Sequence, residues 1–142
     1  MESSTQAGWQ LEAQIERDTV QVGDLTLCSV RAINDATYPW LVLVPRKVGA
    51  TEIIDLAEAD RMQLMTEIST AATALKDITR CDKLNIGAIG NLVPQLHIHI
   101  VARRRDDPAW PKPVWGAAPA QPYAQHTLGA FVESVRETLG IV

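Results

Sequence analysis

The most informative segment of the chain is Pro94–Val101, which reads Pro-Gln-Leu-His-Ile-His-Ile-Val. Polar and apolar side chains alternate along it, and this is the period of a β-strand, whose successive side chains point to opposite faces. One face then carries the leucine and the two isoleucines, and the other carries Gln95, His97 and His99. The two histidines lie ~7 Å apart at ~3.3 Å per residue. The sequence therefore predicts an amphipathic strand with three polar side chains in a row.

The histidine pair is open to more than one interpretation. An imidazole can attack an electrophile, hold an anion or bind a metal, although a histidine on a strand is most often structural. A zinc site needs further ligands. The remaining histidine, His126, falls at the start of the last expected helix, and no cysteine or carboxylate stands at ligand spacing beside the pair. Phosphoryl chemistry and, less favoured, metal binding are both left open by the residues themselves.

Apolar patterns on both sides of this strand outline the rest of the chain. They predict a short helix ending near Asp18, strands on either side of a turn at Gly23-Asp24, a buried strand at 40–44, a long helix at 57–79, a strand at 83–89, a tight connection at Gly90-Asn91, and a helix at 124–139. The segment 106–122 is rich in proline and is expected to be irregular. This order predicts an α+β fold with a mostly antiparallel sheet.

The long helix carries the clearest helical periodicity. Apolar residues recur at steps of three and four, which predicts one buried face: Met62, Met65, Ile68, Ala72, Leu75 and Ile78. The two methionines are interpreted as core filler.

The overall composition is that of an ordinary globular protein. The chain has 142 residues with 46% hydrophobic and 21% charged, so we expect one domain over residues 1–142. The net charge of -4 gives no general attraction for nucleic acid. No apolar run reaches the ~20 residues that span a bilayer, and the first residues lack a signal-peptide pattern. We expect a cytoplasmic protein with no nucleic-acid or membrane partner, and the two distant cysteines agree with a reducing compartment.

The histidine-containing strand resembles the signature of the histidine triad (HIT) family, in which three histidines alternate with apolar residues. The strand Leu41–Val44, closed by a proline, and the position of Asn34 are also similar to that family, and the match covers about residues 20–105. The resemblance implies a five-stranded antiparallel sheet with a long central helix and a C-terminal helix. It also implies a homodimer and a ribose contact from Asn34.

The activity that the resemblance implies is attack on the α-phosphate of a nucleotide conjugate, such as a phosphoramidate or a dinucleoside polyphosphate. The middle histidine of the motif is His97, which would form a covalent nucleotidyl intermediate that water hydrolyses. His99 would donate a hydrogen bond to the phosphate. The second nitrogen of His97 must donate to a fixed acceptor, which we expect to be a backbone carbonyl on the neighbouring strand. This scheme needs no metal and no cofactor.

The chain departs from the family pattern at three places. Gln95 replaces the first histidine; it can donate a hydrogen bond to the phosphate but cannot supply a proton. Asn91 and Leu92 stand where the family has phosphate-contacting glutamine and serine or threonine, and only Asn91 can take over such a contact. Trp40 stands where the family often has histidine. The departures indicate a divergent subgroup, and a non-catalytic nucleotide-binding module or a His-x-His metal protein are the alternative hypotheses.

Charged and aromatic residues after the motif have two interpretations each. Arg103 is either part of a solvated strand end or a phosphate contact, and Arg46 is expected at the surface. Trp110 and Trp115 either pin a rigid loop to the surface or form a specificity segment that stacks on a base or walls off the leaving group.

Overall fold

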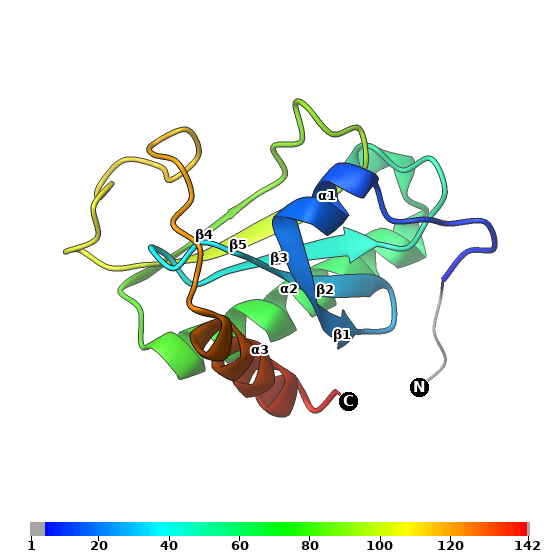
Figure 1. Cartoon of the computed structure of the whole chain (residues 1–142). Helices are drawn as coiled ribbons and strands as arrows, with labels where there is room; N and C mark the ends of the chain where they lie inside the picture. The colour runs from blue at the N-terminus through cyan, green and yellow to red at the C-terminus, as the bar shows by residue number, and fades with distance from the viewer. Residues whose placement is uncertain (1–4, 142) are drawn as a thin grey trace.

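The computed structural model describes residues 5–141 and shows one five-stranded antiparallel sheet (Figure 1). The strand order is β1-β2-β3-β5-β4. The strands are β1 (Thr19–Asp24), β2 (Cys28–Ile33), β3 (Trp40–Pro45), β4 (Lys83–Gly87) and β5 (Ile98–Arg103). The helices are α1 (Ala13–Asp18), α2 (Glu58–Thr79) and α3 (Gln125–Leu139), with a 3-10 turn at Ile53–Asp55. This confirms the α+β fold with a long central helix and a C-terminal helix.

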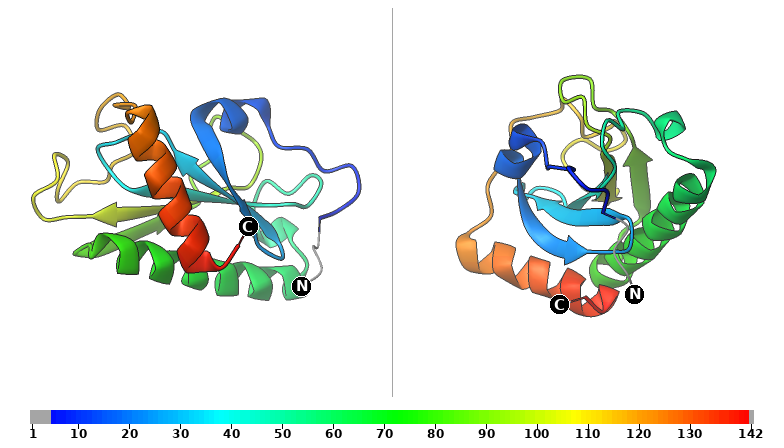
Figure 2. Two further views of the ribbon diagram at one scale, coloured as in Figure 1. Left: turned by 60° about the horizontal axis from the view of Figure 1, so that its bottom comes forward. Right: turned by 90° about the vertical axis from the view of Figure 1, so that its right-hand side faces the viewer.

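The two long helices cover one face of the sheet, and α1 lies on the other (Figure 2). Helix α2 packs on β5 and β3, while α3 packs on β1 and on α2. Between helix and sheet lies the main core, to which β5 contributes Ile98 and Ile100. The opposite face has a smaller apolar cluster that includes Val42 and Val101. Because side chains alternate along a strand, His99 of β5 belongs to this second face, and His97 just before the strand lies beside it.

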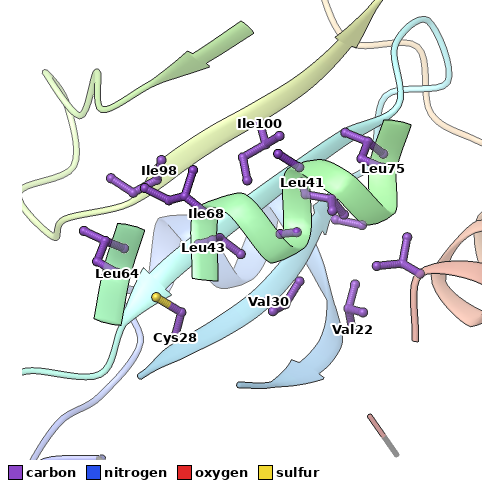
Figure 3. Packing of buried hydrophobic residues seen from close by; sticks show 14 of the residues in the cluster. Val22, Cys28, Val30, Leu41, Leu43, Leu64, Ile68, Leu75, Ile98 and Ile100 are labelled. Carbon is purple, nitrogen blue, oxygen red and sulfur yellow. The ribbon is translucent and has the colours of Figure 1, made fainter. Parts of the chain in front are cut away.

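The core confirms the buried strand β3 but corrects the buried face of α2. Leu64, Ile68 and Leu75 of α2 lie over the sheet (Figure 3). Met62 and Met65, interpreted as core filler, are instead 67% and 63% exposed. Each helical residue is turned ~100° from the one before it, so Met65 lies at the margin of the stripe that Leu64 begins. The methionines recur at the helical spacing of three and four residues, but they do not lie on the face of α2 that packs on the sheet.

Both expected tight turns are wrong in position. Gly23 and Asp24 lie inside β1, where they pair with Val30 and Ser29, and the chain turns at residues 25–27. The register of β1 shifts between Gln21 and Gly23, which is the mark of a β-bulge. The extra residue of the bulge moves the turn beyond the Gly-Asp pair.

Strands β4 and β5 pair as neighbours, but the long segment 88–97 joins them instead of a tight turn at Gly90. The φ of Gly90 is +55°, a conformation that glycine adopts without strain.

Arg46, expected at the surface, is buried, because its guanidinium donates to the carbonyls of Leu25 and Thr26 in the β1–β2 turn. Within residues 5–141, no helix combines the length and apolar character that crossing a bilayer requires. The cytoplasmic location stays a prediction.

Candidate functional site

The structure brings His97 and His99 together on the sheet face opposite the long helices. Their ring centroids are 5.0 Å apart, with the planes at 73°. The two residues are 9% and 8% exposed, so the pair sits in a largely water-excluded place. Val42 pairs with His99 across the sheet and lies in the same small cluster as Trp40. The alternating pattern of the sequence thus predicted the shared face correctly.

His97 is oriented by a bond to its own segment of chain. Its Nδ1 lies 2.7 Å from the backbone oxygen of Gln95. A carbonyl only accepts hydrogen bonds, so Nδ1 carries the proton and the lone pair of the neutral ring is on Nε2. This corrects the expectation of an acceptor on the neighbouring strand. The sheet ladder of β5 begins at Ile98, so the carbonyl of Gln95 is left for the imidazole.

The Nε2 atom of His97 is the reactive atom that this geometry leaves available. It forms no hydrogen bond with residues 5–141, and it is not among the buried polar atoms that lack a partner. It therefore reaches the surface. Gly90 adjoins the other edge of the ring, since a Cβ on this glycine would lie 3.5 Å from Cε1 of His97. A neutral imidazole held in this way has the form of a nucleophile.

His99 lies among aromatic rings. The indole N–H of Trp40 donates to its Nδ1 over 2.9 Å. The rings of Trp40 and Trp115 both lie with their centroids 5.6 Å from the imidazole. Burial first, and then repulsion from His97, lower the pKa of His99 to about 4. His99 is therefore neutral at physiological pH.

This burial predicts a pH-dependent stability. The unfolded chain binds a proton at His99 below pH ~6.5, whereas the folded protein does so only near pH 4. Between these values the unfolded state holds more protons, so stability falls as the pH is lowered, by ~3 kcal/mol in total, and above pH ~6.5 the effect vanishes. Urea denaturation from pH 4.5 to 7.5 should show a smaller slope in His99→Asn and an unchanged slope in His126→Asn, on the exposed face of α3. Equal slopes in wild type and His99→Asn would contradict this account.

Gln95 is tied to the N-terminal strap, the segment of residues 8–12. Its Oε1 accepts from the backbone N–H of Glu12, and its Nε2 donates to the backbone oxygen of Gln10. Each of these hydrogen bonds is 2.8 Å long. Trp9 and Leu11 of the strap pack against the same cluster as Trp40. The side chain of Gln95 thus fastens the strap beside the histidine pair. These bonds use its amide oxygen and one of its two amide hydrogens, which were expected to donate to a phosphate.

The two asparagines have different surroundings. Asn91 is exposed in the segment 88–97, next to the glycine that adjoins His97. Asn34 follows β2, and its Oδ1 accepts from the backbone N–H of Tyr123 over 2.9 Å. Asn34 thereby holds the chain that leads into α3, and its amide nitrogen makes no bond with residues 5–141.

Arg103 is not a solvated strand end, because it is buried and bonded within the protein. It is 1% exposed, and its Nε and Nη2 donate to the Asp107 carboxylate over 2.7 and 3.0 Å. Its Nη1 donates to Asn85 over 2.8 Å, and the guanidinium lies 5.8 Å from the Tyr38 ring and 5.5 Å from the Trp110 ring. These internal partners account for the position of the guanidinium, and the phosphate contact of Arg103 stays a prediction.

The two tryptophans of the proline-rich segment have different neighbours. Trp110 packs on the Arg103 guanidinium. Trp115 lies against His99 and Trp40, and the absence of a side chain at Gly87 leaves room for it, since a Cβ there would be 3.6 Å from the indole. Both indoles line a groove of about 670 Å³, together with Tyr38, Pro108, Ala109, Lys112, Pro113 and residues 116–118. Trp115 lies between this groove and His99, since it lines the groove and its ring contacts the imidazole.

A metal finds few ligands here. No group of three or more histidine, cysteine, aspartate or glutamate side chains that could hold an ion gathers anywhere in residues 5–141. The Nδ1 atoms of both histidines are already hydrogen bonded. The metal-binding hypothesis thus has no third ligand in the described part of the chain.

Comparisons with known proteins show which family the chain resembles in sequence and fold. A model of the HIT domain matches residues 14–106. A histidine triad protein from Bradyrhizobium japonicum has a similar structure at a TM-score of 0.91 and 53% identity, covering 92% of this chain and 98% of that one. Two more are from Sinorhizobium meliloti (0.90, 40% identity, 92% and 97% covered) and Marinobacter aquaeolei (0.90, 38%, 93% and 96%). Among curated proteins, none matches at a significant level. The chain therefore belongs to the histidine triad family.

Proposed function

We propose that the protein is a nucleotidyl hydrolase or transferase that cleaves nucleotide conjugates at the α-phosphate through a covalent intermediate on His97. The observation that carries this proposal is the state of His97: its Nδ1 is bonded to the oxygen of Gln95, and its Nε2 has no hydrogen-bond partner within residues 5–141 and is not fully buried. The HIT family generally comprises nucleotide hydrolases and transferases, which supports the same reaction class.

The reaction has two steps at phosphorus. Nε2 of His97 attacks, a P–N bond forms, and the bond to the leaving group breaks with its electron pair on that group. The imidazole becomes a cation, which the carbonyl of Gln95 stabilises because hydrogen bonds from charged donors are stronger. Water, or an acceptor in a transfer, then attacks phosphorus. The electron pair of the P–N bond returns to Nε2, and the proton of the water leaves with solvent.

Other residues of the site receive supporting roles in this proposal. His99 donates to the phosphate, Asn91 contacts it from the segment 88–97, and the amide nitrogen of Asn34 binds a ribose hydroxyl. Trp115 walls the leaving-group side, where it separates the histidine pair from the groove. Gln95 acts through its carbonyl on His97 and through its side chain on the strap.

The site favours a leaving group that departs as a stable anion. Gln95 cannot protonate a leaving group, and His99 is neutral with a pKa of about 4. A phosphate anion needs no proton to leave, whereas the amine of a phosphoramidate does. We therefore expect dinucleoside polyphosphates to be cleaved faster than nucleoside phosphoramidates, by roughly tenfold or more.

A quenched substrate panel tests this function. Dinucleoside polyphosphates and phosphoramidates are mixed with the protein, the reaction is stopped in acid-free denaturant, and peptides are weighed by mass spectrometry. We expect one nucleoside monophosphate on the peptide that carries His97, with release of product. If nucleoside monophosphate binds tightly while no conjugate is cleaved and no adduct forms, the chain is a non-catalytic nucleotide-binding module.

We also propose that the protein forms a homodimer. Strand β4 is at the edge of the sheet, so within residues 5–141 one of its sides has no neighbouring strand and can pair with a second chain. Ile86 of β4 and Ile89 just after it are large apolar side chains that remain exposed. A molar mass of twice the chain in light scattering, lost on Ile86→Lys, is the expected result; a monomer in wild type would contradict it.

A further inference from the structure

Trp40 is the residue whose role the sequence did not suggest, because its contact with His99 joins positions 59 apart in the chain. An indole N–H can only donate, so the His99 Nδ1 that receives it must be unprotonated. A neutral imidazole with a bare Nδ1 carries its proton on Nε2. The bond from Trp40 therefore selects one tautomer of His99 and disfavours the charged form, which has no lone pair to accept with.

The opposite nitrogen of His99 is the end that a ligand meets. Nε2 of His99 makes no bond with residues 5–141, and it is not among the buried polar atoms without a partner. We propose that Trp40 is a positioning residue that keeps His99 as a neutral donor with its proton on Nε2, aimed at the phosphate that His97 attacks. The aim at phosphate rests on the proposed function, whereas the choice of tautomer does not.

Trp115 shows that contact between aromatic rings alone does not select the tautomer of His99. Its ring centroid is as far from His99 as that of Trp40, at 5.6 Å. However, its indole nitrogen is buried without a hydrogen-bond partner within residues 5–141, so it donates nothing to the imidazole. The two tryptophans thus lie at the same centroid distance from His99, but only Trp40 is hydrogen bonded to it within residues 5–141.

The surroundings of His99 explain why it would keep this neutral tautomer over a wide pH range. Trp40 faces it from β3, Trp115 from the proline-rich segment, and Gly87 is its partner on β4. None of these three titrates. His97, which lies just before β5, is a titratable neighbour, and a positive charge there would further oppose protonation of His99. The donor on Nε2 would then stay in place as the pH falls.

Nitrogen NMR of the imidazoles tests the inference directly on the whole protein. In wild type we expect a bare Nδ1 and a protonated Nε2 on His99 at neutral pH, with the Trp40 indole proton bonded to that Nδ1. In Trp40→Phe, which keeps an aromatic ring, the protonation midpoint of His99 should rise by ~1 pH unit. Trp115→Phe is the matched control and should leave the midpoint and the tautomer as in wild type.

The outcomes separate this inference from the proposed reaction. A wild-type His99 with its proton on Nδ1 overturns it without any variant, and so does an equal midpoint in Trp40→Phe and Trp115→Phe. If wild type cleaves conjugates, Trp40→Phe should also lower kcat by roughly 10-fold to 100-fold, because the Nε2 donor of His99 is no longer fixed. Failure of the proposed reaction appears instead as no cleavage in wild type, with the NMR result unchanged.

Discussion

Replacement of His97 by alanine should lower kcat/KM for nucleotide conjugates by roughly 10³-fold or more, because it removes the atom that bonds to phosphorus. The covalent adduct should disappear in the same variant. Binding of nucleoside monophosphate should change much less, since phosphate donors such as His99 remain. Steady-state kinetics with a conjugate and calorimetry with the monophosphate give the two numbers.

Two further variants make the His97 result specific. His126→Ala removes the exposed histidine of α3 and should keep wild-type turnover. His97→Gly leaves a gap beside the carbonyl of Gln95, and added imidazole should restore part of the activity by taking the place of the side chain. A residual kcat/KM within about fivefold of wild type in His97→Ala would remove His97 from the chemistry.

Replacement of Asp107 by alanine should reduce the free energy of unfolding by ~3–5 kcal/mol, because it leaves the buried guanidinium of Arg103 without its counter-charge. The carboxylate also accepts from the backbone N–H groups of Arg104 and Trp110, so the turn after β5 loses its anchor as well. Urea denaturation of Asp107→Ala against wild type measures the loss. Asp106→Ala removes the adjacent exposed carboxylate and should cost less than ~0.5 kcal/mol.

The ion pair between Arg103 and Asp107 also predicts how the stability of the protein changes at low pH. The bond from Arg103 holds the pKa of Asp107 below its usual range. A carboxyl with a lowered folded pKa adds stability above its unfolded pKa of ~4, and this stability is lost as the pH falls through the folded value. Asp107→Ala should therefore lose stability more at pH 7 than at pH 2–3. An equal loss at both pH values would show that the charge of Asp107 is not what stabilises the turn.

Much of the sheet could be predicted because it follows from local patterns. The alternation in the segment before Ala102 placed both histidines on one face, and the continuous apolar run from Trp40 gave a strand buried on both faces. The C-terminal helix ends at Gly140, whose φ of +68° matches the terminating role of glycine. These features depend on the spacing of neighbouring residues, and this spacing is present in the sequence.

The errors arise where a residue's environment comes from distant segments. Met65 fits the helical period, but the way α2 packs on the sheet leaves it exposed. The Gly23-Asp24 pair has turn chemistry, but a bulge in the preceding strand displaces the turn. Arg103 looks like a surface charge in sequence, and it is buried because Asp107, Asn85 and two aromatic rings surround it.

The fold class and the shared face of the two histidines follow from the residue pattern, because side-chain alternation is a property of the strand alone. How each imidazole is held depends on the packing of the elements: His97 is held by a carbonyl left unpaired before β5, and His99 by Trp40 from another strand. The same packing decides that Gln95 fastens the N-terminal strap. Hydrogen bonds between segments far apart depend on how the elements pack, and no local pattern encodes that packing.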